Sequence, residues 1–494
     1  MSNVSRLRIA IYSIFFFASL ILLCSCLTLD TPIAEQVSNG ATQTESILPQ
    51  QVKKLEEIDI PTEQVVNETA QILNVIPKYS FSVIIDYDQH TAEINEVIEY
   101  QNRTGERLTL LQISIPPDHY PDSFSLSNYS SEPDSELIAP IGNHDPWVVD
   151  LSRPLEAGEI IRMAFNYVIH LPATAGSFGY SEQQANFQNW YPYIQPLDLH
   201  KGWIDNDYSP IGEYIVSEKA NFFVNIRANQ DLVIAGAGKE YVNPDGSITF
   251  THVNTRDFTF SISPKFRKYS TDLGNVVVNA YVFSDSEDSA KELIRNSSAA
   301  LVYFGSLYDM DYPHATLNIV EADFPDGMEA DGIYFLSRDY LNSFDGTHRN
   351  YLTILSAHET AHQWFYGIVG NNQATEPWLD EALCTLSEIL YYQEFYSSDA
   401  EWWWDYRVNS YKPDGNVDGS VYQYDSLRSY LNEVYLQGAR FLHELRTLVG
   451  DEAFITALRN YVYENSNRIA DEEDFFRQFA LFNIDDLKDL YFFQ

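Results

Sequence analysis

Two histidines and a glutamate in one short segment have the types and spacing needed to hold a metal ion. The segment at 356–365 reads Ser-Ala-His-Glu-Thr-Ala-His-Gln-Trp-Phe, with His358 and His362 four residues apart. Positions four apart on a helix share a face, so both imidazoles can reach one ion. Zinc suits two neutral imidazoles, a carboxylate and a water. Glu359 is placed to accept a proton from that water, which is the chemistry of metal-assisted hydrolysis.

A third ligand is expected from the segment at 376–382, Glu-Pro-Trp-Leu-Asp-Glu-Ala, which begins a second predicted helix. Glu381 follows His362 by 19 positions. A second helix packed antiparallel to the first would bring this carboxylate to the metal, so we expect one zinc ion per chain, bound by His358, His362 and Glu381. The alternative is an ordinary helix with half-buried histidines, in which Glu381 is a surface charge.

The chain that must position these residues has two halves, which differ in the spacing of their apolar side chains. Residues 81–87 and 111–115 alternate apolar and polar side chains, which is typical of strands, so we expect an all-β domain at 78–268. A mainly helical α+β domain is expected at 269–494, with strands at 276–283 and 316–321. Its predicted helices cover residues 289–308, 350–366, 377–395 and 434–449.

Composition excludes several classes of protein. The chain has 494 residues, 45% of them hydrophobic, which is enough for large cores and excludes a wholly disordered or fibrous protein. Thirty Lys and Arg against 71 Asp and Glu give a formal charge of −41. A field of that sign repels phosphate backbones, so we expect no nucleic-acid partner.

The N-terminus has the pattern of a targeting segment. Arg6 and Arg8 precede an apolar run at 9–23, which is short for a membrane span and suits a signal peptide. The run ends in Leu-Cys-Ser-Cys, which resembles a bacterial lipoprotein signal and implies lipidation of Cys26, although Cys24 stands where a small residue is usual. We expect a signal peptide at 1–26, a disordered tether at 27–77 and an extracytoplasmic, cell-surface location. An uncleaved anchor and simple cleavage stay open as alternatives.

Two other features have ordinary interpretations. With only three cysteines the chain has no disulfide framework, and Cys384 is interpreted as a buried, inert thiol. The run Trp402-Trp403-Trp404 is interpreted as core packing, with a peptide cleft as the alternative.

The zinc motif, the eighteen intervening residues and the glutamate within Trp-Leu-Asp-Glu resemble the aminopeptidase N family of gluzincin zinc metallopeptidases. Asn-Trp-Tyr-Pro at 189–192 and Ile-Gly-Glu at 211–213 also resemble segments of the family's β-domain, so the resemblance covers roughly residues 79–494. It implies a multidomain fold class, with an N-terminal antiparallel β-sandwich or saddle domain followed by an α+β thermolysin-like zincin catalytic domain.

The same resemblance implies roles for further residues. His358, His362 and Glu381 match the family's zinc ligands, and Glu359 matches its general base. The segment Gly327-Met328-Glu329 matches a substrate-binding motif whose glutamate holds the free α-amino group, but Ala330 replaces the motif's asparagine. Tyr435, in a Tyr-x-x-Gly setting, matches the tyrosine that donates a hydrogen bond to the tetrahedral intermediate.

These observations predict a zinc-dependent aminopeptidase that hydrolyses N-terminal peptide bonds through a metal-activated water. Its partners would be peptide substrates and, through an N-terminal lipid or an uncleaved anchor, a membrane. One alternative is a gluzincin endopeptidase. The other is a non-catalytic, surface-binding lipoprotein that keeps a vestigial site.

Overall fold

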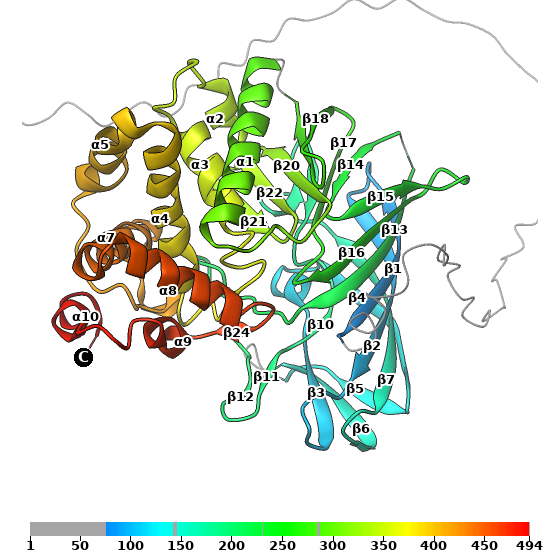
Figure 1. The fold of residues 1–494 in the computed structure, drawn as a ribbon. Helices are drawn as coiled ribbons and strands as arrows, with labels where there is room; N and C mark the ends of the chain where they lie inside the picture. Colours follow the sequence, from blue (N-terminus) through cyan, green and yellow to red (C-terminus); the bar gives the residue numbers. More distant parts are fainter. Residues whose placement is uncertain (1–75, 142–145, 230, 284–286, 494) are drawn as a thin grey trace, which may run out of the picture. The chain divides into compact units, whose positions relative to one another are not determined.

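The computed structural model describes residues 76–494, apart from 142–145, 230, 284–286 and 494 (Figure 1). All of the described residues belong to one compact unit, 65–494. The predicted signal peptide at 1–26, with Cys24 and Cys26, and all but the last two residues of the predicted tether at 27–77 lie outside the described residues. The domain boundary expected at 268/269 stays a prediction.

The N-terminal half is built from strands, as the alternating pattern predicts. In β1 the side chains of Phe81, Val83 and Ile85 are buried while Ile84 faces solvent. The largest sheet is antiparallel except for the pair β1 and β13, which are parallel and are joined by a long connection. Its strands, in spatial order, are β15 (Lys239–Val242), β16 (Ile248–Thr255), β13 (Ala220–Ala228), β1 (Lys78–Asp86), β2 (Thr91–Gln101), β7 (Ile160–His170) and β4 (Phe124–Glu132).

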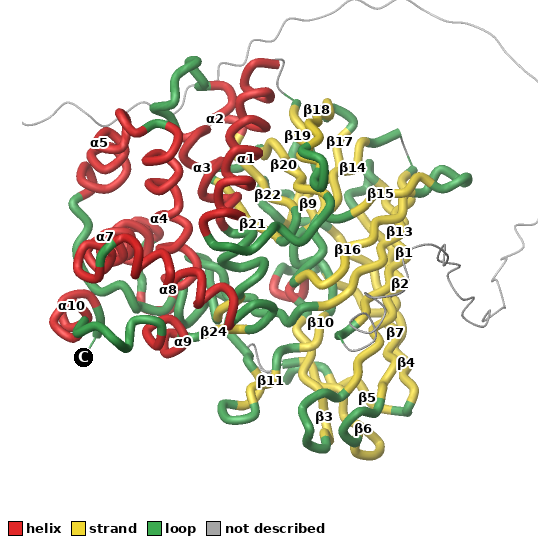
Figure 2. The backbone as a smooth tube through the Cα atoms, viewed as in Figure 1, coloured by secondary structure: helices red, strands yellow, loops and turns green. Residues whose placement is uncertain are grey.

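Smaller sheets complete this half (Figure 2). One contains β10 (Tyr193–Ile194), β3 (Leu108–Ser114), β6 (Trp147–Leu155) and β5 (Ser135–Ile138). Another contains β14 (Val233–Gly236), β17 (Phe260–Ser263), β9 (Ala185–Phe187) and β8 (Phe178–Tyr180). The short strands β11 (Leu197–Asp198) and β12 (Gly202–Trp203) pair with each other.

A five-stranded sheet lies between the β-rich half and the helices. Its order is β18 (Arg267–Asp272), β19 (Val277–Val282), β20 (Thr316–Ala322), β22 (Ile333–Ser337) and β21 (Gly327–Ala330). Its inner strands β19, β20 and β22 are parallel, while β18 and β21 are antiparallel edge strands. One set of side chains packs with the helices: Val278, Ala280, Val282, Leu317, Ile319, Tyr334 and Leu336. The alternate set packs with the β-rich half: Tyr281, Val320, Ala322, Ile333 and Phe335. Burial on both faces explains why the inner strands β19, β20 and β22 are mostly apolar.

Helices make up most of the rest of the α+β half, and the first three of them pack against one side of the sheet (Figure 1). They are α1 (Glu287–Leu307), α2 (Arg338–Asn342), α3 (Tyr351–Ala361), α4 (Trp378–Phe395), α5 (Ala400–Trp403), α6 (Leu427–Tyr430), α7 (Gly438–Val449), α8 (Asp451–Glu464), α9 (Glu472–Arg477) and α10 (Asp485–Tyr491). Two π-helical turns, Trp404–Val408 and Leu431–Gln437, follow α5 and α6. Short 3₁₀ turns lie at Pro116–His119, Ser397–Asp399, Asn409–Tyr411 and Val421–Gln423, and β23 (Gly370–Asn371) pairs with β24 (Ile469–Ala470).

The structure confirms the fold class, a β-rich N-terminal half followed by an α+β half, but α3 is shorter than predicted. The apolar pattern extends to Tyr366, whereas the helix ends at Ala361. The chain turns sharply there, because the amide of Gly367 donates to the carbonyl of His362 at 2.8 Å and Tyr366 has a φ of 133°. Trp364 and Phe365, which follow the helix, are buried in the same core as the helix itself, so their hydrophobicity does not reveal the helix end.

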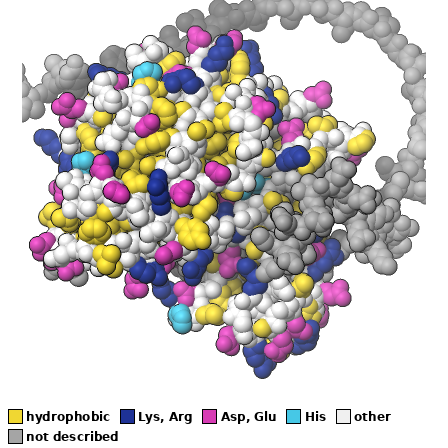
Figure 3. Space-filling view, viewed as in Figure 1, with side chains coloured by type: hydrophobic (Ala, Val, Ile, Leu, Met, Phe, Trp, Pro, Cys, Tyr) yellow, Lys and Arg dark blue, Asp and Glu magenta, His cyan; other side chains and the backbone are white. Residues whose placement is uncertain are grey.

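On the face shown in Figure 3, acidic and basic side chains lie interspersed over the surface. None of the helices within the described residues has both the length and the apolar character that a membrane crossing requires.

One buried arginine joins the two halves. Arg256, which follows β16, is 3% exposed. Its guanidinium donates to the backbone carbonyls of Ser217 at 3.0 Å and Arg468 at 2.7 Å, and it reaches that of Ile368 at 3.3 Å. A Cβ at Gly370 would overlap the guanidinium, so this glycine makes room for it. The arginine therefore satisfies carbonyls from segments far apart in the chain.

We expect Arg256→Leu to lower the free energy of unfolding by about 3 kcal/mol or more, because it leaves several buried carbonyls without a donor. Urea denaturation followed by circular dichroism measures this loss. The control is Arg227→Leu, which removes an exposed ion pair with Asp245 and should change stability by less than about 0.5 kcal/mol. Equal effects of the two substitutions would contradict the role assigned to Arg256.

Candidate zinc centre and active site

The two histidines of the metal motif lie at the end of α3. The helix begins at the N-cap Asn350, whose side chain accepts from the amide of Thr353 at 2.9 Å. His362 directly follows the last helical residue and keeps helical backbone angles, so its side chain stays on the face of His358. The structure thus brings the two imidazoles together as the spacing predicts.

The third predicted ligand, Glu381, comes from the first turn of α4, which packs against α3. Its Oε2 lies 3.2 Å from Nε2 of His358 and 3.5 Å from Nε2 of His362. Zinc with ligands at 2.0–2.1 Å in a tetrahedron separates its ligand atoms by about 3.3–3.4 Å. The three atoms are therefore spaced as zinc requires, and each residue is at most 3% exposed.

The protonation of the two rings also suits a cation. Nδ1 of His358 lies 2.8 Å from Oε1 of Glu388, and Nδ1 of His362 lies 2.8 Å from Oδ1 of Asp380. A proton on each Nδ1 satisfies these carboxylates and leaves the Nε2 lone pairs facing Glu381. The two Nε2 lone pairs and the Glu381 carboxylate repel one another in this buried space unless a positive charge lies between them. The residues present therefore fit a bound zinc ion.

Glu388 is held by more donors than His358 alone. Trp403 donates its Nε1 to Oε2 at 3.0 Å, and Arg407 donates Nε and Nη2 to the two carboxylate oxygens at 3.0 Å each. Burial would raise the pKa of Glu388, but Arg407 and His358 outweigh it and hold the pKa below its ordinary value. Trp403, the middle residue of the tryptophan run at 402–404, is therefore buried and contacts Glu388. This agrees with the interpretation of the run as core packing.

Glu359, the predicted general base, lies buried beside the two imidazoles. Burial raises its pKa to about 8, with both imidazoles opposing the shift. Within the described part of the chain its Oε2 has no hydrogen-bond partner. A Cβ at Gly327 would overlap the carboxylate of Glu359, so only glycine lets strand β21 approach so closely. One carboxylate oxygen of Glu359 is therefore available for a further hydrogen bond beside the predicted metal ligands.

A group of three carboxylates lies beside the metal ligands. Oxygen atoms of Glu213, Glu329 and Glu381 lie within 4.8 Å of one another. Burial raises the pKa of Glu329 to about 7, with His362 opposing, and burial together with Glu329 raises that of Glu213 well above its usual range. The side chain of Gln373 donates to Oε1 of Glu329 at 3.0 Å. Such a group favours a bound cation, which would let the carboxylates ionise.

Two cavities meet at these carboxylates. One, of about 270 Å³, is lined by Glu359, the three metal ligands and Tyr435. The other, of about 260 Å³, extends away from the metal and has no Lys or Arg among its lining residues. Glu213, Met328 and Glu329 line both. The predicted substrate motif at 327–329 therefore lies at the boundary between the cavities.

Tyr435 lies over the metal site, on the π-helical turn that precedes α7. Its ring is parallel to that of His358, at a centroid distance of 5.8 Å. A Cβ at Gly438 would overlap Ala382, so this glycine lets the turn pack closely on α4 beside Glu381. Tyr430 also lines the metal cavity, and its buried hydroxyl has no partner within the described chain.

Sequence reasoning missed four of these residues. The sequence pattern assigns no role to Glu213, and it does not indicate that Asp380, Glu388 and Arg407 support the predicted metal ligands. One signal was available, because Glu388 lies seven residues after Glu381 and thus on the same face of α4. Nothing in the sequence links Arg407 or Glu213 to the metal.

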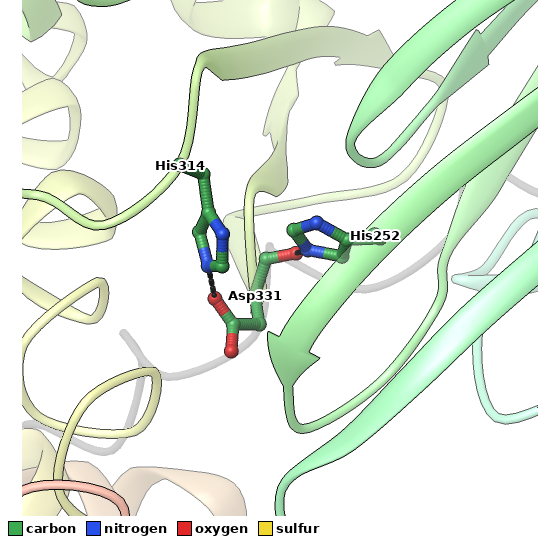
Figure 4. A group of neighbouring side chains, drawn as sticks. All are labelled: His252, His314 and Asp331. Atoms are coloured by element: carbon green, nitrogen blue, oxygen red, sulfur yellow. Dashed lines mark hydrogen bonds and ion pairs between the residues drawn. The ribbon is translucent and has the colours of Figure 1, made fainter. Parts of the chain in front are cut away.

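A second group of His and Asp side chains, His252, His314 and Asp331, has metal-ligand types but different geometry (Figure 4). Nε2 of His252 donates to the backbone oxygen of Asp331 at 2.8 Å, and Nε2 of His314 donates to its Oδ1 at 2.7 Å. These are hydrogen-bond lengths, and Nζ of Lys219 lies 2.8 Å from the other carboxylate oxygen. The group is a hydrogen-bonded ion-pair network and does not fit a metal.

Cys384 is fully buried next to the metal ligands, as predicted. Burial raises the pKa of its thiol well above the ordinary value, which keeps the thiol protonated and unreactive.

We expect Glu388→Gln to weaken zinc binding by about 10–100-fold, because an amide orients the His358 ring less well than a carboxylate. Competition with a chromophoric chelator measures the affinity. Glu159→Gln, which alters exposed contacts with Arg153 and with the amide of Glu156, is the control and should bind zinc as the wild type does. Wild-type affinity in Glu388→Gln would remove Glu388 from this role.

Comparison with known proteins finds similarity to the M1 peptidase domain and to aminopeptidases. Residues 294–491 match the model of the peptidase family M1 domain. "Aminopeptidase 2" of Candida albicans is 21% identical over 436 residues, which is 81% of this chain and 45% of the relative. "Aminopeptidase N" of Haemophilus influenzae is 26% identical over 225 residues, 42% of this chain and 26% of the relative. The chain thus spans less than half the length of these curated relatives.

A solved structure shares the fold. The crystal structure of a mutant two-domain M1 zinc metallopeptidase bound to L-arginine superposes with a TM-score of 0.59 at 16% identity. The match covers 84% of this chain and 92% of the other. The M1 domain matched at residues 294–491 and the similarity to these aminopeptidases agree with the resemblance seen in the motifs to the aminopeptidase N family of gluzincins.

Proposed function

We propose that the protein is a zinc-dependent aminopeptidase that removes residues from the N-termini of peptides. The observation that carries the proposal is the position of Glu213 and Glu329 at the boundary of the two cavities, directly beside the metal ligands. An ammonium group bound there places the first peptide bond over the metal. The first side chain then occupies the 260 Å³ cavity, and the rest of the peptide follows the metal cavity.

Each side chain has a distinct task in this proposal. A bound zinc ion supplies Lewis-acid polarisation and lowers the pKa of water. Glu359 takes the proton from the attacking water and returns it to the leaving amine. Tyr435 donates a hydrogen bond to the oxygen on which negative charge develops. Glu329 and Glu213 hold the substrate ammonium through charge-assisted hydrogen bonds.

One zinc ion per chain is part of the same proposal. Its support is the ligand spacing at His358, His362 and Glu381. The hydrogen-bond lengths within the group around Asp331 speak against a second ion there.

Glu359→Gln should abolish turnover while zinc stays bound. Glutamine keeps the size of the side chain but cannot accept the proton, so water is not activated. Hydrolysis of an aminoacyl fluorogenic amide and metal analysis of the same sample test both parts. Appreciable turnover in a zinc-loaded Glu359→Gln protein would assign the base elsewhere.

A ten-residue peptide should lose residues one at a time from its N-terminus, and its N-acetylated form should resist. Acetylation removes the positive charge that Glu329 and Glu213 bind. Mass spectrometry of timed digests, with and without a chelator, gives the order of products. Internal cleavage products appearing first, or equal cutting of the acetylated peptide, would favour the endopeptidase. No chelator-sensitive hydrolysis of either peptide would favour the non-catalytic lipoprotein.

We also propose that the protein is anchored at the cell surface, outside the cytoplasm, through a lipid on Cys26. The support is the sequence pattern of the first 26 residues, with its two arginines, apolar run and terminal Leu-Cys-Ser-Cys. Metabolic labelling with a fatty-acid probe should mark the wild type and leave Cys26→Ser unlabelled. Labelling that survives this substitution would point to Cys24 or to an uncleaved anchor.

A further inference from the structure

We propose that Asp331, held by Lys219 from the β-rich half, is a positioning residue that places Glu329 for recognition of a free α-amine. The inference rests on the proposed function and assigns part of its selectivity to residues outside the active-site cavities. Neither Asp331 nor Lys219 lines either of the two cavities at the metal site.

The strand that carries Glu329 needs external support. β21 has only four residues and is an edge strand that pairs with β22 alone. Its position is therefore set mainly by the turn that joins it to β22. This turn consists of Asp331 and Gly332, which has a φ of 84°, and Asp331 lies two residues after Glu329.

Asp331 fixes this turn through its carboxylate (Figure 4). Nζ of Lys219 lies 2.8 Å from Oδ2, and Nε2 of His314 lies 2.7 Å from Oδ1. The backbone amide of Arg256 donates to Oδ2 at 3.0 Å. The side chains of Asp331 and Lys219 are 1% and 4% exposed, so this ion pair is shielded from solvent. A shielded pair with several hydrogen bonds fixes geometry more firmly than a surface pair.

The backbone of Asp331 is held as well. Its amide donates to Oδ2 of Asp257 at 3.1 Å, and its carbonyl accepts from Nε2 of His252 at 2.8 Å. Lys219, His252, Arg256 and Asp257 all belong to the β-rich half. Both the side chain and the backbone of Asp331 are thus attached to the half of the protein that does not supply the predicted metal ligands.

The residues on either side of Asp331 are attached to the segment that directly follows α3. Gln363, the residue after the metal ligand His362, donates Nε2 to the carbonyl of Ala330 at 3.1 Å and accepts from the amide of Gly332 at 2.9 Å. The β-rich half adds a contact to Glu329 itself, where Nε2 of Gln188 donates to its carbonyl at 2.6 Å. The distance between the metal and Glu329 is therefore set by contacts from both halves meeting at this turn.

A pair of zinc-chelating ligands isolates this role. An aminoacyl hydroxamate carries a free α-amine, and its des-amino analogue is identical apart from that group. The ratio of their affinities for the zinc-loaded protein, measured by calorimetry, reports amine recognition without turnover. In Asp331→Asn we expect this ratio to fall about tenfold, with the affinity for the des-amino ligand unchanged.

Two further variants keep the test interpretable. Asp331→Asn leaves Lys219 buried without its partner, so the double variant Lys219→Met with Asp331→Asn is measured beside it and should show the same fall. Thr316→Val is the control, because it removes another hydrogen bond between the halves, from Thr316 Oγ1 to the carbonyl of Gly238 at 2.9 Å, without touching the turn. Its ratio should match the wild type.

The outcomes separate the two proposals. A wild-type ratio in the folded Asp331 variants would overturn the positioning role, and so would an equal loss of affinity for both hydroxamates, which indicates general damage to the site. A wild-type protein that binds both hydroxamates equally would contradict the proposed aminopeptidase function, and the positioning role with it.

Discussion

Two imidazole nitrogens and a carboxylate oxygen converge on one buried point, with a spacing of 3.2 and 3.5 Å, and the rest of the site depends on this convergence. The ligands come from α3 and α4, so their spacing requires these helices to pack closely. It also requires each ring to present its Nε2 lone pair inward, which Glu388 and Asp380 ensure by engaging Nδ1. Burial makes the arrangement unfavourable without a cation and therefore strongly selective for one.

The second constraint is the gathering of buried carboxylates beside the predicted metal ligands. Glu213 comes from the β-rich half and Glu329 from an edge strand of the other half, and both lie beside the metal ligand Glu381. Neither half alone forms this group of carboxylates. The buried contacts between the halves, at Arg256 and around Asp331, therefore help to hold this group of carboxylates together.

Much of the site could be predicted because its chemistry is local in sequence. The four-residue spacing of His358 and His362 fixes their common face, and Glu381 follows at the start of the next helix. The strands at 81–87 and 111–115 and the helices at 289–308 and 377–395 were likewise visible as periodic patterns, and β1, β3, α1 and α4 confirm them.

The remainder depends on tertiary contacts that no local pattern encodes. The sequence pattern predicts that the helix extends to residue 366, whereas α3 ends at Ala361, because the segment after Ala361 is as apolar as the helix. Arg407, which bonds to Glu388, lies on the π-helical turn Trp404–Val408, and no spacing in the sequence predicts this contact. Glu213 and Asp331 are ordinary loop or turn acids in the sequence, and their environment arises only when the two halves pack together.

The most direct test of the account is zinc stoichiometry and coordination in the purified protein. Elemental analysis with X-ray absorption spectroscopy should show one zinc per chain, with only nitrogen and oxygen ligands that include two imidazoles. His362→Ala, in a protein that keeps its fold, should lose stoichiometric zinc. Stoichiometric zinc in that variant, or a sulfur ligand from Cys384 in the wild type, would contradict the ligand set on which the whole interpretation rests.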